Sequence, residues 1–274
     1  ENRGLINQIT DEGLIKKLNS PITLYCGFDP TGDSLHVGSL VGIIILKHFE
    51  NYGHKNIALV GGATGLIGDP SFKADERSLN SKDTVVKFTE AIQSQLIKYL
   101  DQDNTKFLNN YDWTKDINVI DFLRDYGKSF TINYMLAKDS VSSRMETGLS
   151  FTEFAYSILQ GMDFNYLYQN HNCILQIGGS DQWGNMTSGL ELIRKNNEDG
   201  SLCIKTFKFS NTIEINEGVK FISDNFTLFD VEELEYLHNL ISEMTYIDLK
   251  TNEFVYGISF DELKLIYKPF VDRI

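Results

Sequence analysis

Apolar residues along the first two thirds of the chain follow two alternating patterns. Short, continuous β-prone runs predict buried strands, and longer segments with apolar residues every three or four positions predict helices. Val85, Ile92 and Leu96 are examples of the helical spacing. The expected strands are 22–25, 56–60, 106–109 and 173–179, and the expected helices are 40–49, 84–99, 119–126, 133–138, 152–168 and 188–195.

The order of these elements predicts a fold class. Strands alternate with helices, and glycine-rich turns follow two of the strands, at 61–65 and 178–179. Parallel strands need such helical crossovers, and the loops that follow the strands collect at one edge of the sheet. The pattern therefore predicts an open parallel α/β sheet with a site at the C-terminal ends of its strands.

The last part of the chain has a different pattern. Segments 232–244 and 260–267 have the spacing of short amphipathic helices with acidic first turns, and no strand alternation surrounds them. We therefore expect two domains, an α/β domain over 1–205 and a smaller all-helical domain over 206–274.

Composition narrows the class of protein. The chain has 274 residues, of which 42% are hydrophobic and 12% aromatic, enough for a packed core, and no apolar run approaches the roughly 18 residues of a membrane span. A net charge of −13 argues against non-specific coating of nucleic acid, because phosphate contacts need clustered Lys and Arg. The cysteines, Cys26, Cys173 and Cys203, lack the paired spacing of a zinc site or a disulfide framework, which suggests a reducing compartment.

The segment 25–40 is the first candidate for chemistry. A strand reaches the turn Asp29-Pro30-Thr31-Gly32, and His36-x-Gly38 then opens an apolar helix. A strand, a turn and a helix N-terminus in this order present backbone N–H groups and a positive dipole end to an anion. The histidine lies where it can donate a hydrogen bond to a phosphate, so nucleotide binding is the first hypothesis.

Two other loops and one helix could complete the site. In the loop 65–77, Lys73 and Arg77 are spaced to clasp a polyphosphate, although a solvated surface loop would have the same composition. The loop 176–185 carries polar side chains that could bind sugar hydroxyls or an amino acid, or could simply form a tight turn before a helix. Tyr156, Gln160 and Asp163 share one face of a helix, which is either part of a site or a polar outer face.

Taken together, these segments resemble the catalytic domain of the bacterial-type tyrosyl-tRNA synthetases, which are class I aminoacyl-tRNA synthetases. The resemblance runs from about residue 24 to 195. The strings that carry it are Tyr25-Cys26-Gly27-Phe28-Asp29-Pro30-Thr31, Ala63-Thr64-Gly65-Leu66-Ile67-Gly68-Asp69-Pro70-Ser71, Asn109-Asn110-Tyr111-Asp112-Trp113, Ser150-Phe151-Thr152-Glu153-Phe154 and Gly178-Gly179-Ser180-Asp181-Gln182-Trp183-Gly184-Asn185.

The resemblance implies a Rossmann-like fold and an enzyme that forms tyrosyl-adenylate from L-tyrosine and ATP, with Mg²⁺, and then charges tRNA(Tyr). It implies no tightly bound cofactor and no resident metal. The implied tyrosine-binding residues are Tyr25, Asp69, Tyr156, Gln160, Asp163 and Gln176. The implied ATP-site residues are Cys26, Gly27, Asp29, His36, Gly38, Ser39, Gly179, Asp181 and Gln182. The residues implied to assist the reaction itself are Thr31, His36, Lys73 and Arg77.

The chain departs from the family pattern in several places. Ser39 stands where the family usually has a second histidine, and Phe72 where it usually has glycine. After Asn197 the family continues into a strand and a lysine-bearing loop, whereas this chain passes directly to 198–203, which resembles the stretch beyond that loop. Either residues are missing between 197 and 198, which a Cα–Cα separation well beyond about 3.8 Å would indicate, or the chain is a degenerate relative.

Three function classes follow. The leading one is an active tyrosine–tRNA ligase, expected as a homodimer with Phe151 in the segment that matches the family's dimer interface. The others are a catalytically impaired synthetase-like protein that binds RNA or tyrosine, and another superfamily member such as a tryptophan enzyme or a small-molecule nucleotidylyl transferase. We expect no membrane partner and a cytoplasmic location, or an organellar one with a removed targeting peptide. By the resemblance, 206–274 would be the anticodon-side domain and the start of a linker, and the usual C-terminal RNA-binding domain would not be present.

Overall fold

The computed structural model describes residues 6–70, 79–142, 144–145, 148–196, 205–209, 245–248 and 253–256. The strands are β1 (Ile6–Ile9), β2 (Thr23–Phe28), β3 (Lys55–Val60), β4 (Thr105–Asn109), β5 (Cys173–Gly179), β6 (Lys205–Phe209), β7 (Thr245–Asp248) and β8 (Glu253–Tyr256). The α-helices are α1 (Leu14–Lys17), α2 (Val37–Asn51), α3 (Thr64–Ile67), α4 (Lys82–Tyr99), α5 (Tyr111–Thr114), α6 (Val119–Asp121), α7 (Ile132–Leu136), α8 (Asp139–Ser142), α9 (Phe151–His171) and α10 (Trp183–Asn196). Short π and 3-10 turns are η1 (Phe122–Tyr126), η2 (Gly127–Ser129) and η3 (Ser180–Gln182).

The main sheet has the strand order β1-β6-β5-β2-β3-β4. Strands β6, β5, β2, β3 and β4 run parallel, and only β1 pairs with its neighbour antiparallel. The chain builds the sheet outward from β2 in one direction and then returns to add β5 on the other side. The predicted Rossmann-like parallel sheet is confirmed, and its switch point lies between β2 and β5.

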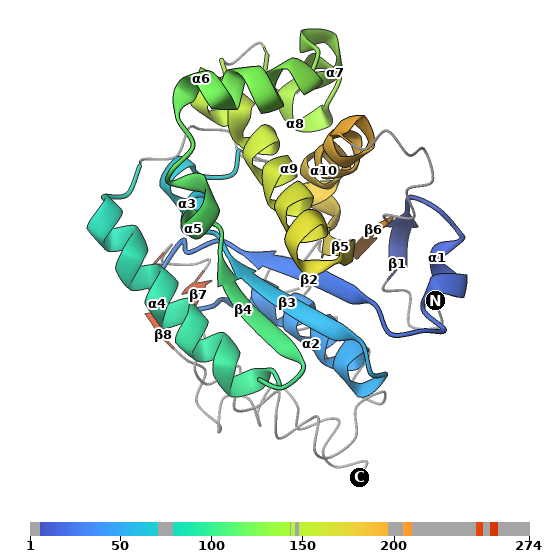
Figure 1. Cartoon of the computed structure of the whole chain (residues 1–274). Helices are drawn as coiled ribbons and strands as arrows, with labels where there is room; N and C mark the ends of the chain where they lie inside the picture. Colours follow the sequence, from blue (N-terminus) through green and yellow to red (C-terminus); the bar gives the residue numbers. More distant parts are fainter. Residues whose placement is uncertain are drawn as a thin grey trace.

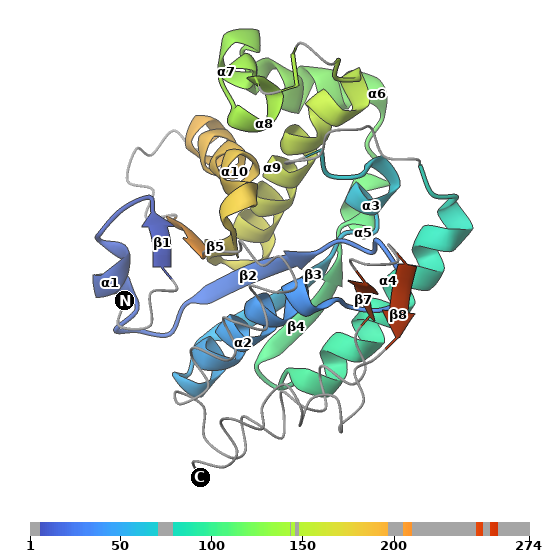
Figure 2. The same cartoon turned by 180° about the vertical axis from the view of Figure 1, so that it is seen from behind.

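Two helical layers cover the sheet because successive side chains of its strands point to opposite faces. Leu24 and Cys26 of β2 belong to the apolar cluster that α2 and α4 complete, whereas Tyr25 belongs to the cluster that α9 and α10 complete. Figure 1 shows α9 and α10 in front of the sheet, and Figure 2 shows α2 on the opposite face. Both faces of the central strands are therefore buried.

The long helices α4 and α9 begin where the sequence supplies a cap. The side chains of Ser81 and Ser150 accept hydrogen bonds from backbone N–H groups in the first turns of α4 and α9. Serine caps satisfy donors that would otherwise remain unpaired at a helix start. Helix α9 ends at His171, and the next residue, Asn172, caps it in a left-handed conformation with a φ of 51°.

Small residues allow α9 and α10 to cross closely. A Cβ on Gly161 of α9 would lie 3.3 Å from the carbonyl carbon of Ser188, and one on Gly189 of α10 would lie 2.8 Å from the ring of Phe164. Any larger residue at position 189 would push the helices apart or displace that ring. The close crossing fixes α9, the helix that carries Tyr156 and Asp163.

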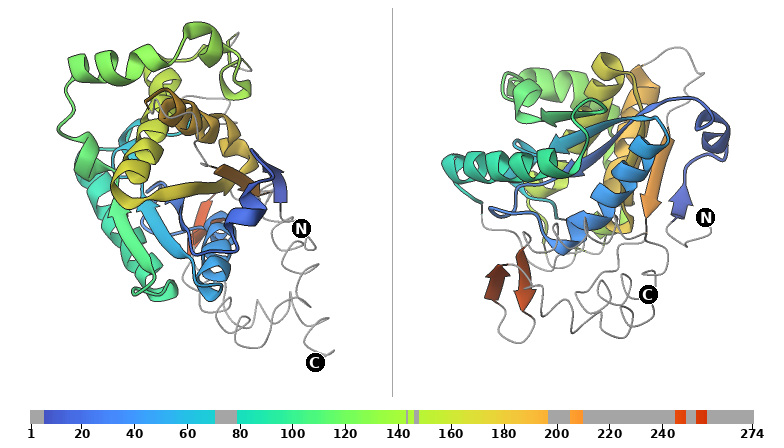
Figure 3. Two further views of the ribbon diagram at one scale, coloured as in Figure 1. Left: turned by 45° about the vertical axis from the view of Figure 1, so that its right-hand side comes forward. Right: turned by 90° about the horizontal axis from the view of Figure 1, so that it is seen from below.

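The short helices α6 and α7 lie together at one end of the molecule, beside the beginning of α9 (Figures 1 and 3). Phe130 and Met135 pack there against Ile158 and Met162 of α9. Large apolar side chains remain exposed at the same end, namely Val119, Ile120, Leu123, Ile132 and Phe151. None of the helices in the described ranges is long and apolar enough to cross a bilayer.

The part of the chain after 205 differs from the prediction where it is described. Strand β6 belongs to the main sheet, so the sheet extends to Phe209. Strands β7 and β8 pair antiparallel, so 206–274 is not all-helical in its described residues. The expected helices 232–244 and 260–267 and the break between Asn197 and Glu198 lie outside the described residues.

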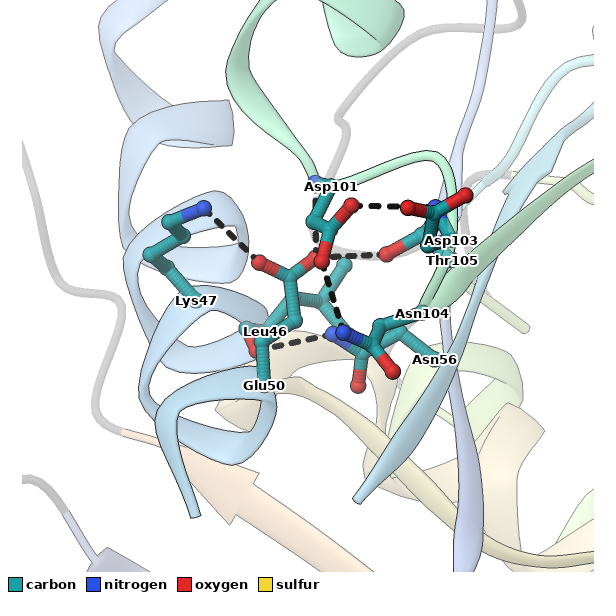
Figure 4. A network of polar contacts seen from close by, with 8 residues as sticks. All are labelled: Leu46, Lys47, Glu50, Asn56, Asp101, Asp103, Asn104 and Thr105. Atoms are coloured by element: carbon teal, nitrogen blue, oxygen red, sulfur yellow. Dashed lines mark hydrogen bonds and ion pairs between the residues drawn. The ribbon is translucent and has the colours of Figure 1, made fainter. Parts of the chain in front are cut away.

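A polar network closes the N-terminal edge of the sheet (Figure 4). Glu50, at the end of α2, accepts hydrogen bonds from the Thr105 hydroxyl at 2.5 Å and from the Asp101 backbone N–H at 3.1 Å. Its second carboxylate oxygen lies 2.9 Å from the Lys47 ammonium. The Asn56 amide donates to the Leu46 carbonyl at 2.8 Å. These contacts join the end of α2 to the starts of β3 and β4.

Candidate active site

The opposite edge of the sheet gathers polar side chains from segments far apart in the sequence. They follow the C-terminal ends of parallel strands or lie on α9, which crosses above them. Asp29 follows β2, Thr64 and Asp69 follow β3, and Asn110 follows β4. Polar side chains therefore lie at the C-terminal ends of the strands, which is the edge of the sheet where the sequence predicted a site.

Tyr25 and Gln176 form the deepest part of this edge. They lie opposite each other on β2 and β5 and are 1% and 3% exposed. The pairing depends on a bulge, because Thr23 pairs with Cys173 whereas Leu24 pairs with Leu175, which leaves Ile174 as an extra residue. Within the described residues, neither the Tyr25 hydroxyl nor the Gln176 amide oxygen has a hydrogen-bond partner. Buried groups of this kind are costly unless a ligand or water satisfies them.

Asp163 of α9 lies near this pair. Its carboxylate, 3% exposed, accepts hydrogen bonds from the Trp113 indole and the Asn110 amide, both at 2.9 Å. Burial raises the pKa of Asp163 to about 7, although these two hydrogen bonds act in the opposite direction. Burial and the nearby Asp163 charge in turn raise the pKa of Tyr25 well above its usual value.

Asp29 connects β2 to α9 and to the turn after β3. The Tyr156 hydroxyl donates to one carboxylate oxygen at 2.6 Å, and the Thr64 hydroxyl donates to the other at 2.7 Å. A Cβ on Gly61 would lie 1.9 Å from that second oxygen, so only glycine permits this approach. Burial and the charge of Asp29 are the leading causes that raise the pKa of Tyr156, which therefore stays protonated and donates.

Asp69 meets the turn that follows β5. The Gln182 amide donates to Asp69 at 2.5 Å and to Asp181 at 2.8 Å. Asn185, in the first turn of α10, donates to Asp69 at 3.4 Å and to the Gln182 carbonyl at 3.3 Å. The charge of Asp69 also raises the pKa of Tyr156, so the carboxylates of Asp29 and Asp69 both affect the Tyr156 hydroxyl.

The connection from β2 to α2 and the first turn of α2 carry three of the residues predicted to lie near the phosphates of a nucleotide, namely Thr31, His36 and Ser39. His36 caps α2, and its Nδ1 accepts a hydrogen bond from the Gly38 N–H at 3.1 Å. In a neutral ring the other nitrogen, Nε2, then carries the proton and is a donor. Thr31 and His36 are exposed, and Ser39 is half-buried. A Cβ on Gly27 would meet no heavy atom within 4 Å, so β2 borders open space at this point.

The geometry suits a ligand with two polar ends. At one end are a buried phenol, a buried amide oxygen and a carboxylate held by neutral donors. At the other end are Asp29, Asp69 and Tyr156, a set that favours a cationic group. Beyond them the start of α2 offers backbone N–H groups and a positive dipole end, which favour an anion.

Comparisons with known proteins agree with this arrangement. Residues 16–221 match the family described as tRNA synthetases class I (W and Y). The chain belongs to this family. It is 56% identical over 230 residues to Tyrosine--tRNA ligase 1 of Bacillus anthracis, covering 81% of this chain and 54% of the relative. It is 60% identical over 199 residues to the Tyrosine--tRNA ligase of Geobacillus kaustophilus, covering 70% of this chain and 48% of the relative. The chain thus spans about half the length of these curated relatives.

Solved structures show the same fold. A C-terminally truncated mitochondrial tyrosyl-tRNA synthetase of Aspergillus nidulans matches with a TM-score of 0.69 at 23% identity, over 99% of this chain and 83% of that one. A tyrosyl-tRNA synthetase from Pyrococcus horikoshii, solved in complex with L-tyrosine, matches with a TM-score of 0.56 at 18% identity, over 82% of this chain and 65% of that one.

Not every predicted site residue has a described contact. Lys73 and Arg77, like Phe72, lie in 71–78, outside the described residues. Gln160 is half-buried on α9, between Tyr156 and Asp163, and Gly179 is buried at the end of β5. The Cys26 side chain lies on the α2 face of the sheet, and burial raises its pKa to about 12. The roles assigned to these residues stay predictions.

Sequence reasoning missed three residues that hold the site together. Asn110 donates to both Asp163 and Thr64 and accepts from the Ala63 N–H at 2.7 Å. Trp113 stacks on Tyr166 and also donates to Asp163. The third is Thr64, whose hydroxyl donates to Asp29. Asn110 could have been found, because it follows a predicted strand and must therefore lie at the same edge as the glycine-rich loops.

Over the part of the chain that the structure describes, no group of three or more His, Cys, Asp or Glu side chains could hold a metal ion. Mg²⁺ commonly binds through substrate phosphates with few protein ligands, so a site of this kind can accommodate Mg²⁺ together with a nucleotide.

Proposed function

We propose that this chain carries the amino-acid-activating site of a tyrosine–tRNA ligase. The observation that carries the proposal is the buried set of Tyr25, Asp163 and Gln176, two of which have polar atoms without a partner within the described residues. A phenol hydroxyl can donate to Asp163 and accept from Tyr25. L-Tyrosine would satisfy the Tyr25 hydroxyl and the Asp163 carboxylate in this way, and the curated relatives named above are tyrosine ligases.

Selectivity follows from the cost of leaving these groups unpaired. Phenylalanine would fill the same space and leave the Tyr25 hydroxyl and the Asp163 carboxylate without a ligand partner. Tryptophan offers a single N–H in a different position and cannot accept a hydrogen bond. The buried pair therefore favours tyrosine over both.

The ammonium group of tyrosine would lie among Asp29, Asp69 and Tyr156. The Tyr156 hydroxyl donates to Asp29 at 2.6 Å, and the charges of Asp29 and Asp69 both raise the pKa of Tyr156. The carboxylates favour a cation by charge, and Gln160 lies on the same helix face as Tyr156. This places the substrate carboxylate toward the start of α2.

The reaction needs no protein nucleophile. The tyrosine carboxylate attacks the α-phosphorus of ATP, the bond to the bridging oxygen breaks, and pyrophosphate leaves with tyrosyl-adenylate as the product. The protein aligns the two reactants and stabilises the charge on the leaving group. We assign the nucleotide contacts to Cys26, Gly27, Asp29, Gly38, Ser39, Gly179, Asp181 and Gln182, and transition-state stabilisation to Thr31, His36, Lys73 and Arg77. Mg²⁺ bound to ATP would neutralise part of the phosphate charge.

The second half-reaction transfers tyrosine to a ribose hydroxyl of tRNA(Tyr), with AMP as the leaving group. The domain division at about 205 and the anticodon-side role of 206–274 belong to this proposal. Bacterial relatives and the cysteine pattern support a cytoplasmic location, with an organellar location as the alternative.

Tyrosine-dependent ATP–pyrophosphate exchange tests the proposal, with phenylalanine and tryptophan as competing substrates. We expect exchange with tyrosine only. Exchange with tryptophan instead would point to the other branch of the family. No exchange, with tyrosine binding retained, would mean a catalytically impaired relative.

The exposed apolar end of the molecule supports a homodimer. Val119, Ile120, Ile132 and Phe151 are 72%, 68%, 62% and 71% exposed. Exposed apolar groups gathered in this way are typical of protein interfaces. Phe151→Asp should shift the protein from dimer to monomer in sedimentation experiments, whereas Tyr52→Asp, at another exposed aromatic, should not. An unchanged sedimentation coefficient for Phe151→Asp would rule out this face.

A further inference from the structure

The connection between β2 and α2 is tied to a helix that contributes no residue to the proposed site. The backbone N–H of Leu35 donates to the side-chain oxygen of Gln95 at 2.7 Å, across 60 positions of sequence. Gln95 is half-buried on α4. The Leu35 side chain is 2% exposed and lies in the same apolar cluster as Ile92 and Leu96 of α4. Leu35 is therefore held to α4 by both its side chain and its backbone.

The next residue along the chain is His36. Its ring is fixed relative to the backbone because Nδ1 accepts the Gly38 N–H as the cap of α2. Whatever sets the position of the backbone at Leu35 thus also sets the position of the imidazole Nε2. At its other end the connection is anchored by Asp29, which Tyr156 and Thr64 hold.

We propose that Gln95 is a positioning residue for adenylate formation. Through the Leu35 N–H it fixes the place of the His36 imidazole relative to the phosphates of ATP. This inference rests on the proposed function. It adds α4 to the elements that determine the rate of the first half-reaction, although α4 has no residue among those proposed to touch substrate.

The inference predicts a specific kinetic effect. Misplacing His36 should lower kcat for exchange by about 10- to 100-fold, since small errors in the alignment of reacting groups are costly. Tyrosine affinity should not change, because Tyr25, Asp163 and Gln176 lie on other elements with contacts of their own. A general loss of structure would instead affect both.

The experiment uses substitutions in the full-length protein. Gln95→Met keeps the length of the side chain and removes the acceptor, whereas Gln95→Glu keeps an acceptor oxygen and should restore most of the activity. Gln93→Met, on the same helix two residues earlier, is the matched control. His36→Asn keeps a capping side chain and removes the imidazole. The readouts are kcat and KM for ATP in exchange, tyrosine affinity by equilibrium dialysis, and the urea midpoint.

The double variant decides between positioning and structure. If Gln95 acts through His36, Gln95→Met should change kcat by no more than about twofold in the His36→Asn background. An equal loss in both backgrounds, or equal losses in Gln95→Met and Gln93→Met, would overturn the inference. Full activity of Gln95→Met would also overturn it. A parent protein without tyrosine-dependent exchange would overturn the proposed function and this inference together.

Discussion

Two buried carboxylates at opposite edges of the same sheet have different environments. Glu50, at the N-terminal edge, is 7% exposed and is matched by the Lys47 ammonium, the Thr105 hydroxyl and the Asp101 N–H (Figure 4). Asp163, at the C-terminal edge, is 3% exposed and is held by two neutral donors.

The difference separates a structural carboxylate from a binding one. The donors around the Glu50 carboxylate come from the fold itself, so this carboxylate is held without a ligand. Asp163 lies beside a phenol and an amide oxygen that have no partner within the described residues. The C-terminal edge therefore keeps hydrogen-bonding capacity that a substrate can use.

The largest expected effect is on Asp163. Asp163→Asn should lower kcat/KM for tyrosine on the order of 100-fold, because a hydrogen bond to a charged group is lost and the substrate hydroxyl is left poorly paired. Discrimination against phenylalanine should weaken in parallel. Initial rates of exchange with each amino acid measure both quantities.

The same variant should not be less stable. The pKa of Asp163 is raised to about 7 in the folded protein, so the stability that its protonated form contributes is lost as the pH rises toward 7. Above that pH the folded protein carries a buried charge that Asn lacks, and removing this charge offsets the loss of one acceptor oxygen for the Trp113 or Asn110 donor. Urea unfolding above pH 7 should give the variant an equal or higher free energy of unfolding. A clear loss would show that Asp163 is structural, like Glu50.

The second expected effect is on stability, at the N-terminal edge of the sheet. Glu50→Ala should lower the free energy of unfolding by about 2 kcal/mol, since it leaves the Thr105 hydroxyl and the Asp101 N–H without their acceptor. Urea denaturation measures this change. The folded fraction should keep parental kcat and KM for tyrosine. A selective loss of tyrosine binding would contradict the division between the two edges.

The smallest expected effect is a shift of the pH profile. Trp113→Phe removes a donor that stabilises the Asp163 carboxylate, so the pKa of Asp163 should rise by about one unit. Since the ionised form accepts the substrate hydroxyl, kcat/KM for tyrosine falls as the pH drops through this pKa. The acid limb of the profile should therefore move to higher pH in the variant. Tyr166→Leu, which removes the stacking partner of Trp113 but not the indole donor, serves as the control.

Much of the fold could be predicted because the apolar pattern of each segment reports its burial. The strand expected at 56–60 is β3, and the helix expected at 84–99 lies within α4. The short helices α3 and α5 were missed because four residues are too few to show a period. Strands β7 and β8 were missed within a segment that looked helical, and their pairing is set by contacts between strands rather than by local pattern.

The candidate site divides in the same way. The order of strands and loops was sufficient to bring Asp29, Asp69 and Asp181 to one edge, because parallel strands end together. The hydrogen-bond partners of these side chains could not be predicted from the sequence, because a bond such as that between Asn110 and Asp163 joins residues 53 positions apart. The role of Trp113 was missed for this reason, since its sequence neighbours predict packing alone.

The sequence by itself determined the alternation of elements, the edge at which the site forms and the family to which the chain is similar. Only the tertiary structure decided which polar atoms are paired and which remain available. The bulge at Ile174 is the clearest case, because it places Gln176 opposite Tyr25. A one-residue change of register moves side chains to the other face of a sheet, and that choice depends on packing across strands rather than on local sequence.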